Sequence, residues 1–212
     1  MIRKVAIVLF WFAFFGYFFY RYIPNVMEYT QVFPSYAGKS WLNNRLWFAL
    51  HITSGLFVYV IGIIQFTSAI RNRYLKLHRV LGKIYIACSL IAILTLAFMI
   101  PDGLCKPCKI SQIILTALWF LFVVLAYYLI RQRKIEWHRR MMISSFICAA
   151  YFVTVRVVDK FAMPFFYSIT KTEEQALLVS DISVWLASLT IFWSYWLIRD
   201  RWVASGISPS SI

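Results

Sequence analysis

Long apolar runs separated by short charged segments extend through the whole chain. Each run approaches the roughly 20 residues that an α-helix needs to cross about 30 Å of hydrocarbon. No Ser/Gly-rich or Pro-rich linker divides the pattern. We therefore predict an all-α, polytopic integral membrane protein in which residues 1–212 form one domain, a bundle of six transmembrane helices. The predicted spans cover approximately residues 5–20, 46–70, 80–100, 110–130, 141–168 and 176–198.

Two of these spans carry features that compete with a simple membrane helix. The first follows Arg3 and Lys4, as the apolar part of a signal peptide would. It is rich in aromatic residues and lacks a cleavage site of small residues, so we interpret it as a helix that stays in the protein. The fifth contains Pro164, which we expect to kink or end that helix.

Two basic segments determine the predicted orientation in the membrane. Residues 71–83 and 131–140 each contain five Lys or Arg and one histidine, so together they hold ten of the 22 basic residues. Loops rich in Lys and Arg stay on the cytoplasmic side of a membrane. We therefore predict that both loops face the cytoplasm, and six spans then place both termini on the same side.

The composition agrees with a membrane protein and limits the classes of partner that we expect. The chain is 62% hydrophobic and 14% charged, with a mean hydropathy of +0.71, which no ordinary soluble domain shows. A net charge of +14 would suggest nucleic acid in a soluble protein. Here the basic residues cluster at the ends of apolar runs, where they meet anionic lipid headgroups. We expect the lipid bilayer as the main partner, a membrane protein or a second copy as a further one, and no nucleic acid.

Cys105 and Cys108 form a C-x-x-C pair in the predicted outer loop between the third and fourth spans. Outside the cytosol such a pair is either a disulfide or a redox-active dithiol. The βαβ context of a thioredoxin-like site is absent, and two cysteines are too few for a four-ligand zinc site. We expect a disulfide that staples the loop, with redox catalysis as the alternative.

Small and polar residues recur at helical spacing on the second, third, fifth and sixth spans. On the second span, His51, Gly55, Val58, Gly62 and Gln65 follow one another in steps of four, three, four and three residues, which places them on one helix face. Small residues let membrane helices approach closely, and polar residues in hydrocarbon tend to face the bundle interior. We expect these faces to form the helix contacts.

Ionisable residues on these faces fall into two layers. The predicted outer layer contains His51, Arg156, Asp159 and Asp181. A charged arginine within a membrane needs a partner, and Asp159 at i+3 or Asp181 on the sixth span can supply it. The cluster is either a structural ion pair or a substrate or proton site.

The predicted inner layer contains His78 and His138, each directly before a span that runs outward and each followed by an arginine, Arg79 or Arg139. Two neutral imidazoles at equal depth can bind one b-type haem, with the arginines meeting the propionates. They can also bind another metal or hydrogen-bond a quinone headgroup. The competing interpretation is that both histidines belong to the basic rim at the membrane surface.

Several motifs together resemble the bacterial membrane proteins grouped as domain of unknown function 2306. The resemblance implies a polytopic protein of the bacterial inner membrane and carries no reaction with it. In having helix histidines within a small bundle, the chain also resembles cytochrome b561-like proteins loosely. The matching motifs are His51, Gly62-x-x-Gln65-Phe66, Arg71, His78-Arg79-x-x-Gly82-Lys83-x-Tyr85, His138-Arg139-x-Met141 and Arg156.

The residues leave three function classes open, with a ligand-binding or redox-accessory role expected first. A redox protein would bind haem or quinone at His78 and His138. A small-molecule transporter would use the outer layer, and an assembly protein would use its aromatics against other membrane proteins. No G-x-S-x-G motif occurs and the three histidines are scattered, so no nucleophile–base arrangement points to a hydrolase. Whether the protein is an enzyme is left open.

Overall fold

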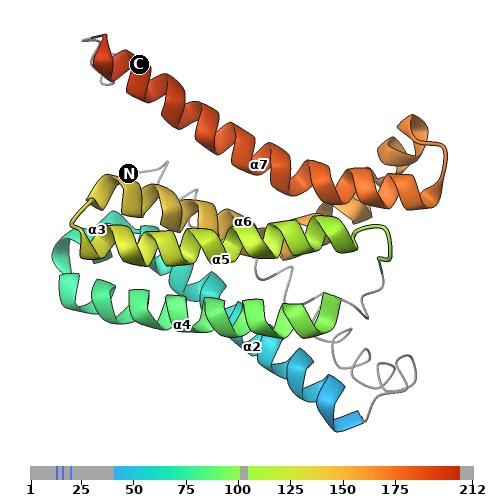
Figure 1. Cartoon of the computed structure of the whole chain (residues 1–212), viewed down its shortest axis with the longest axis horizontal. Coiled ribbons are helices and arrows are strands. Elements are labelled where there is room, and N and C mark those ends of the chain that lie inside the picture. The colour runs from blue at the N-terminus through green and yellow to red at the C-terminus, as the bar shows by residue number, and fades with distance from the viewer. Residues whose placement is uncertain (1–12, 14–15, 17–19, 21–40, 101–104, 206–212) are drawn as a thin grey trace. The chain divides into compact units, whose positions relative to one another are not determined.

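The computed structural model describes residues 13, 16, 20, 41–100 and 105–205 (Figure 1). Contacts divide the chain into Met1–Ala49 and Leu50–Ile212, and the fold and sites below belong to the second unit. Every regular element in the described ranges is a helix. The predicted first span, residues 5–20, lies outside the described residues apart from three isolated positions. The helices are α2 (Trp41–Phe66), α3 (Ser68–Arg73), α4 (Leu75–Met99), α5 (Lys109–Arg131), α6 (Ile135–Ile169) and α7 (Glu173–Ala204).

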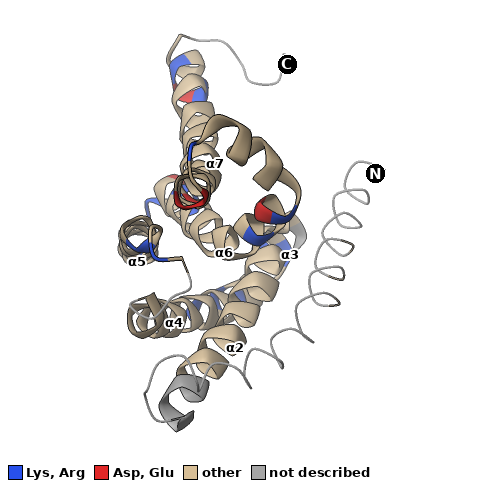
Figure 2. Ribbon diagram, turned by 90° about the vertical axis from the view of Figure 1, so that its right-hand side faces the viewer, with Lys and Arg blue, Asp and Glu red and all other residues tan. Residues whose placement is uncertain are grey.

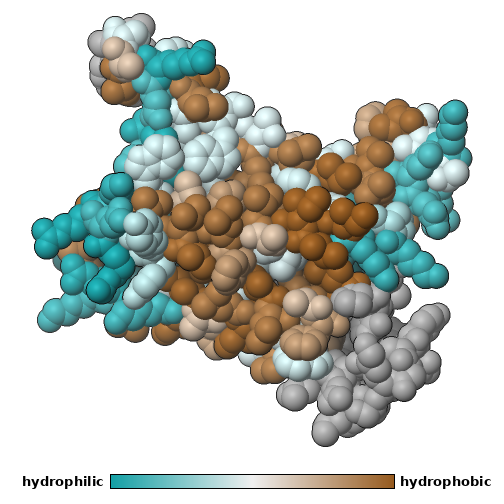
Figure 3. Space-filling view, in the orientation of Figure 1, coloured by the Kyte–Doolittle hydropathy of each residue, from teal (hydrophilic) through white to brown (hydrophobic). Residues whose placement is uncertain are grey.

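Five helices in the described ranges are long and apolar enough to cross a membrane: α4, α5, α6, α7 and the Trp47–Phe66 part of α2. The prediction of an all-α membrane protein is thereby confirmed. Many large apolar side chains are exposed, for example Ile191 at 71% and Phe161 at 67%. Figure 3 shows them as an apolar band between hydrophilic groups at either end. Such a band is expected where lipid, not water, surrounds the helices.

The basic segment at residues 71–83 differs from its prediction, because it is mostly helical instead of a loop. Helix α3 ends at Arg73, Tyr74 alone interrupts the helical backbone, and α4 begins at Leu75. Lys and Arg are good helix formers, so charge marks the membrane surface here without breaking the helix.

The second basic segment contains a short turn between two long helices. Residues Gln132 to Lys134 separate α5 from α6, and Arg133 adopts a positive φ of 60° in this turn. Pro164, expected to kink or end the fifth span, lies inside α6, which continues as a helix to Ile169. A proline removes one backbone hydrogen bond, and membrane helices tolerate that loss.

Helix α6 is the centre of the unit, with α5 and α7 packed along it (Figure 1). It buries more of its length than the other spans do. On the α2 side, Gly62 admits the ring of Phe146, because a Cβ added at Gly62 would collide with that ring. Tyr85 of α4 is 1% exposed and packs into the same core. Close packing of this kind is what holds membrane helices together.

The helices define two ends of the unit that carry different chemistry. We call one the basic end; it comprises α3, the start of α4, the α5–α6 turn and the end of α7. The other is the disulfide end, where α5 starts, α6 ends and α7 starts. Figure 2 shows Lys and Arg gathered at the helix ends, with long uncharged stretches between them.

Candidate functional site

His138 lies in the first turn of α6 at the basic end. Its Nδ1 is 2.8 Å from the backbone carbonyl oxygen of Ala126 in α5. A carbonyl oxygen only accepts hydrogen bonds, so this contact requires the proton on Nδ1. The Nε2 atom of the neutral ring then keeps its lone pair, and no hydrogen bond to Nε2 is found among the described residues. His138 is thus oriented as a ligand-binding imidazole is.

His78 lies in the first turn of α4 and is half-buried. Its Nδ1 is buried and has no hydrogen-bond partner in the described part of the chain. Its backbone carbonyl accepts a hydrogen bond of 2.7 Å from Nε2 of Gln65, a residue near the end of α2 that is 6% exposed. Gln65 therefore fixes the first turn of α4, and with it the position of His78.

The two inner histidines lie at the same end of the unit and interact electrostatically. His78 is within electrostatic range of His138, Arg71 and Arg79. Arg79 and Arg139 are both exposed, and the guanidinium of Arg139 lies 6.0 Å from the ring of Trp196. The basic end thus combines two imidazoles with several positive charges.

A row of polar side chains extends from this end into the middle of the bundle. The hydroxyls of Tyr85 and Ser145 are 3.0 Å apart, and the Tyr59 hydroxyl donates to the carbonyl of Ala149. The hydroxyl of Ser144 is buried and has no partner among the described residues. The row ties α2 and α4 to α6, so the polar faces point inward at these positions. Gly62 and Gln65, which share the expected α2 face, are both buried.

His51 does not join the carboxylates with which it was grouped. Its Nδ1 lies 3.1 Å from the hydroxyl of Thr95 and 3.3 Å from the carbonyl of Ala92, and its ring packs edge-on against Phe152. No described contact links His51 to Asp159 or Asp181. The predicted outer layer therefore separates into His51 of α2, which contacts α4, and a carboxylate site elsewhere.

The expected ion pair of Arg156 is also not formed. Arg156 is exposed, and no ion pair joins it to Asp159 or Asp181 in the described ranges. Helix α6 begins at Ile135, so Arg156 lies about 30 Å along the helix at about 1.5 Å per residue. The hydrocarbon layer is itself about 30 Å thick, so we expect this side chain to reach the headgroup region, where it needs no buried counter-charge.

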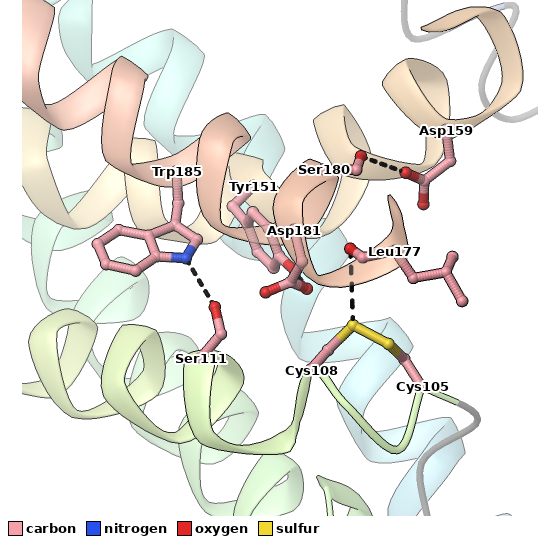
Figure 4. The surroundings of a disulfide bond; sticks show 9 residues. All are labelled: Cys105, Cys108, Ser111, Tyr151, Asp159, Leu177, Ser180, Asp181 and Trp185. Carbon is pink, nitrogen blue, oxygen red and sulfur yellow. Dashed lines mark hydrogen bonds between the residues drawn. A yellow bond between two sulfur atoms is a disulfide. The ribbon is translucent and has the colours of Figure 1, made fainter. Parts of the chain in front are cut away.

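The carboxylates lie instead at the disulfide end, in contact with hydroxyl groups (Figure 4). Asp159 accepts a hydrogen bond of 2.6 Å from Ser180, and Asp181 accepts one from Tyr151. Nearby, Nε1 of Trp185 donates to the hydroxyl of Ser111 over 2.9 Å.

The disulfide that closes this end joins Cys105 to Cys108, directly before α5. Cys108 is 3% exposed, and its sulfur lies 3.9 Å from the carbonyl of Leu177 in α7. The closed turn therefore also contacts the start of α7.

Residues 48–197 match the family model DUF2306, whose description is a predicted membrane protein. The chain belongs to this family. The match begins within α2 and ends within α7, so every predicted site residue from His51 to Asp181 falls inside the DUF2306 region. No curated protein and no solved structure matches the chain.

Within this DUF2306 chain, three residues of the sites escaped the sequence analysis. Arg140 was counted only as part of a basic loop, although it is 6% exposed. Tyr151 and Ser111 were not singled out, yet both lie beside Asp181. Ser111 and Leu115 are four residues apart, so they share one face of α5, and both are buried. This helical spacing could have predicted that Ser111 faces the bundle interior.

Proposed function

We propose that this DUF2306 protein is a membrane-embedded redox protein that binds a b-type haem between His78 and His138. The observation that carries the proposal is the hydrogen bond from Nδ1 of His138 to the carbonyl of Ala126. It holds the ring in one tautomer and leaves the lone pair of Nε2 available to a metal. Such an orienting bond from the far nitrogen is the usual support of a metal-binding histidine.

The number of protein ligands agrees with a haem better than with a bare metal ion. No group of three or more His, Cys, Asp or Glu that could hold a metal is found among the described residues. A structural zinc ion needs four protein ligands. A haem supplies the equatorial nitrogens itself and needs only two axial imidazoles. When bound, it would exchange single electrons.

The surrounding residues would hold and position the group. Gln65 fixes the first turn of α4 through the carbonyl of His78. Arg79 and Arg139 place positive charge at the water boundary, where the carboxylates of haem propionates are suited to lie. The buried Nδ1 of His78 also suits a second ligand at the same place, a quinone headgroup, whose carbonyl oxygen would accept a hydrogen bond from it.

The proposal includes an orientation and a location. We place the basic end in the cytoplasm and the chain in the bacterial inner membrane. The excess of Lys and Arg at this end supports the orientation, because such residues are retained on the cytoplasmic side. The proposed site would then exchange electrons with cytoplasmic partners or with the inner leaflet.

The test is the absorption spectrum of the full chain, purified in detergent from haem-replete cells. We expect a Soret band that shifts on reduction. His78→Ala and His138→Ala should each abolish it, because a bis-histidine haem needs both ligands. His51→Ala is the matched control: it removes a histidine with its own hydrogen bonds in another part of the bundle and should keep the band. A colourless wild-type protein overturns the haem proposal, and extraction of a co-purified quinone from that protein would support the second ligand.

A further inference from the structure

The disulfide end holds two carboxylates, Asp159 and Asp181, that accept hydrogen bonds from hydroxyl groups. Asp159 and Asp181 make no ion pair among the described residues, and Arg156, the expected partner, is exposed. The two carboxylates are within electrostatic range of each other. Two like charges in contact with apolar helices are costly unless something neutralises them.

Asp181 is the more constrained of the two. It is 3% exposed, and its Oδ1 accepts the hydroxyl hydrogen of Tyr151. Its Oδ2 is buried without a hydrogen-bond partner in the described part of the chain. A buried carboxylate oxygen without a partner is rare in folded proteins and calls for an explanation, such as an ion.

The groups around the Asp181 carboxyl group are neutral, oxygen-bearing side chains from other helices. Ser111 and Gln112 of α5 and Tyr151 of α6 lie close enough to act on the Asp181 carboxyl group. Figure 4 shows the ring of Tyr151 reaching the Asp181 carboxylate, with Ser111 on the neighbouring helix. The hydroxyl of Ser111 is already fixed by the hydrogen bond from Trp185, so the site is organised beyond the carboxylate itself.

Asp159 provides the approach to this site. It is half-buried and lies about 36 Å along α6 at about 1.5 Å per residue, which is past the hydrocarbon thickness of about 30 Å. Its carboxylate is held toward α7 by the hydrogen bond from Ser180. A cation from the water phase would therefore meet Asp159 first and Asp181 behind it.

We propose that Asp181, with Ser111, Gln112 and Tyr151, binds a monovalent metal cation at the disulfide end, and that Asp159 attracts the cation to it. Oxygen donors from carboxylate, hydroxyl and amide groups are those that hard cations prefer. One carboxylate among neutral donors balances a single positive charge, which favours a monovalent over a divalent ion. The site is independent of the histidines at the basic end.

The test measures thermal unfolding of the full chain in detergent, followed by tryptophan fluorescence. Sodium chloride is the probe, and choline chloride keeps the ionic strength constant. A ligand that binds only the folded state raises the unfolding temperature with its concentration. We expect the midpoint to rise with sodium and to reach a plateau. Asp181→Asn should abolish the rise, whereas Glu174→Gln, which neutralises an exposed carboxylate at the start of α7, should keep it.

Two further variants keep the test decisive if Asp181→Asn does not fold. Gln112→Leu removes one neutral donor and Asp159→Asn removes the outer charge, so each should require several-fold more sodium for the same rise. Equilibrium binding of radioactive sodium should give one ion per chain, and none in Asp181→Asn. A wild-type protein without a sodium-specific rise would overturn the proposal, because protons alone would then neutralise the carboxylates. A rise of equal size in Asp181→Asn would overturn it as well.

Discussion

Arg140 and Asp200 form a two-pronged ion pair between the start of α6 and the end of α7. Nη1 and Nη2 of Arg140 each donate to one carboxylate oxygen of Asp200, both over 2.7 Å. The guanidinium lies 4.7 Å from the ring of Trp137 and 4.3 Å from that of Trp196. A second pair, Arg199 to Glu136 at 3.1 Å, joins the same two helix ends. We infer that this group of residues fastens α7 to α6 beside His138.

Asp200→Asn is expected to lower the unfolding temperature by several degrees. The lost attraction between Arg140 and Asp200 contributes little, because Asp200 is exposed and water screens its charge. The larger effect comes from Arg140, which is left buried with only the longer contact of 4.0 Å to the Glu136 carboxylate. Arg140→Lys should also destabilise, since lysine neither forms the paired bonds nor stacks between the two indoles. Thermal unfolding in detergent measures both, and Arg201→Gln, an exposed neighbour, serves as the control that should change nothing.

Gly62→Ala is expected to destabilise the protein by about 1–3 kcal/mol, the usual cost of overfilling a packed core. The new methyl group would collide with the ring of Phe146. Gly55→Ala is the matched control on the same helix face, where nothing lies within 4 Å of the added atom. It should be neutral or stabilise by up to about 1 kcal/mol, because alanine favours the helix more than glycine does.

The same contact can be isolated with a second substitution. Phe146→Leu shortens the ring that the added methyl group meets, so Gly62→Ala should cost less in that background than in the wild type. The difference is the coupling between the two positions in a double-mutant cycle. Equal costs in both backgrounds would show that the Gly62–Phe146 contact does not set the packing of α2.

The orientation is expected to place the basic end in the cytoplasm. Single cysteines introduced at the exposed Lys76 and Lys134, with the four native cysteines replaced, should react with an impermeant reagent only after the cells are opened. A cysteine at Thr172, between α6 and α7, should react from the outside. Labelling of Lys76→Cys or Lys134→Cys in intact cells would contradict this orientation.

Cys105 and Cys108 are expected to be oxidised in the native membrane protein, because the disulfide end would face the oxidising side. Mass spectrometry of protein alkylated without prior reduction should find this peptide unmodified. Cys88 and Cys148 are free thiols. The buried Cys148 should be alkylated only after denaturation, whereas the half-buried Cys88 should be alkylated in part before it. Two alkylated cysteines in the 105–108 peptide from freshly isolated membranes would refute the expectation.

Helical spacing alone could predict that polar faces are buried. It could not predict which residues of neighbouring helices these faces contact. Val58, Gly62 and Gln65 lie on the expected face of α2 and are buried. Helical spacing states which residues of one helix share a side, because the period is set by local geometry. It does not state which side of a neighbouring helix they meet. For that reason His51 contacts Thr95 in place of the carboxylates with which it was grouped.

Depth was the second source of error. The fifth span was predicted from residue 141, and α6 in fact begins at Ile135. A shift of six residues moves every later side chain by about 9 Å along the helix. Arg156, expected inside the membrane with a partner, is exposed, and we now expect it at the headgroup region. The equal depth of His78 and His138 stays a prediction, because it was counted from two basic segments expected at the same membrane surface.

The sequence by itself determined that this chain crosses a membrane as helices, where those helices begin and end to within several residues, and which faces they bury. These properties follow from the thickness of hydrocarbon, the helical period and the cost of exposing polar groups to lipid. Only the tertiary structure decided that Nδ1 of His138 bonds to Ala126, that Arg140 pairs with Asp200, and that Oδ2 of Asp181 is left without a partner. Those contacts depend on how each helix is rotated and offset against its neighbours, which many side chains fix together and no local pattern records.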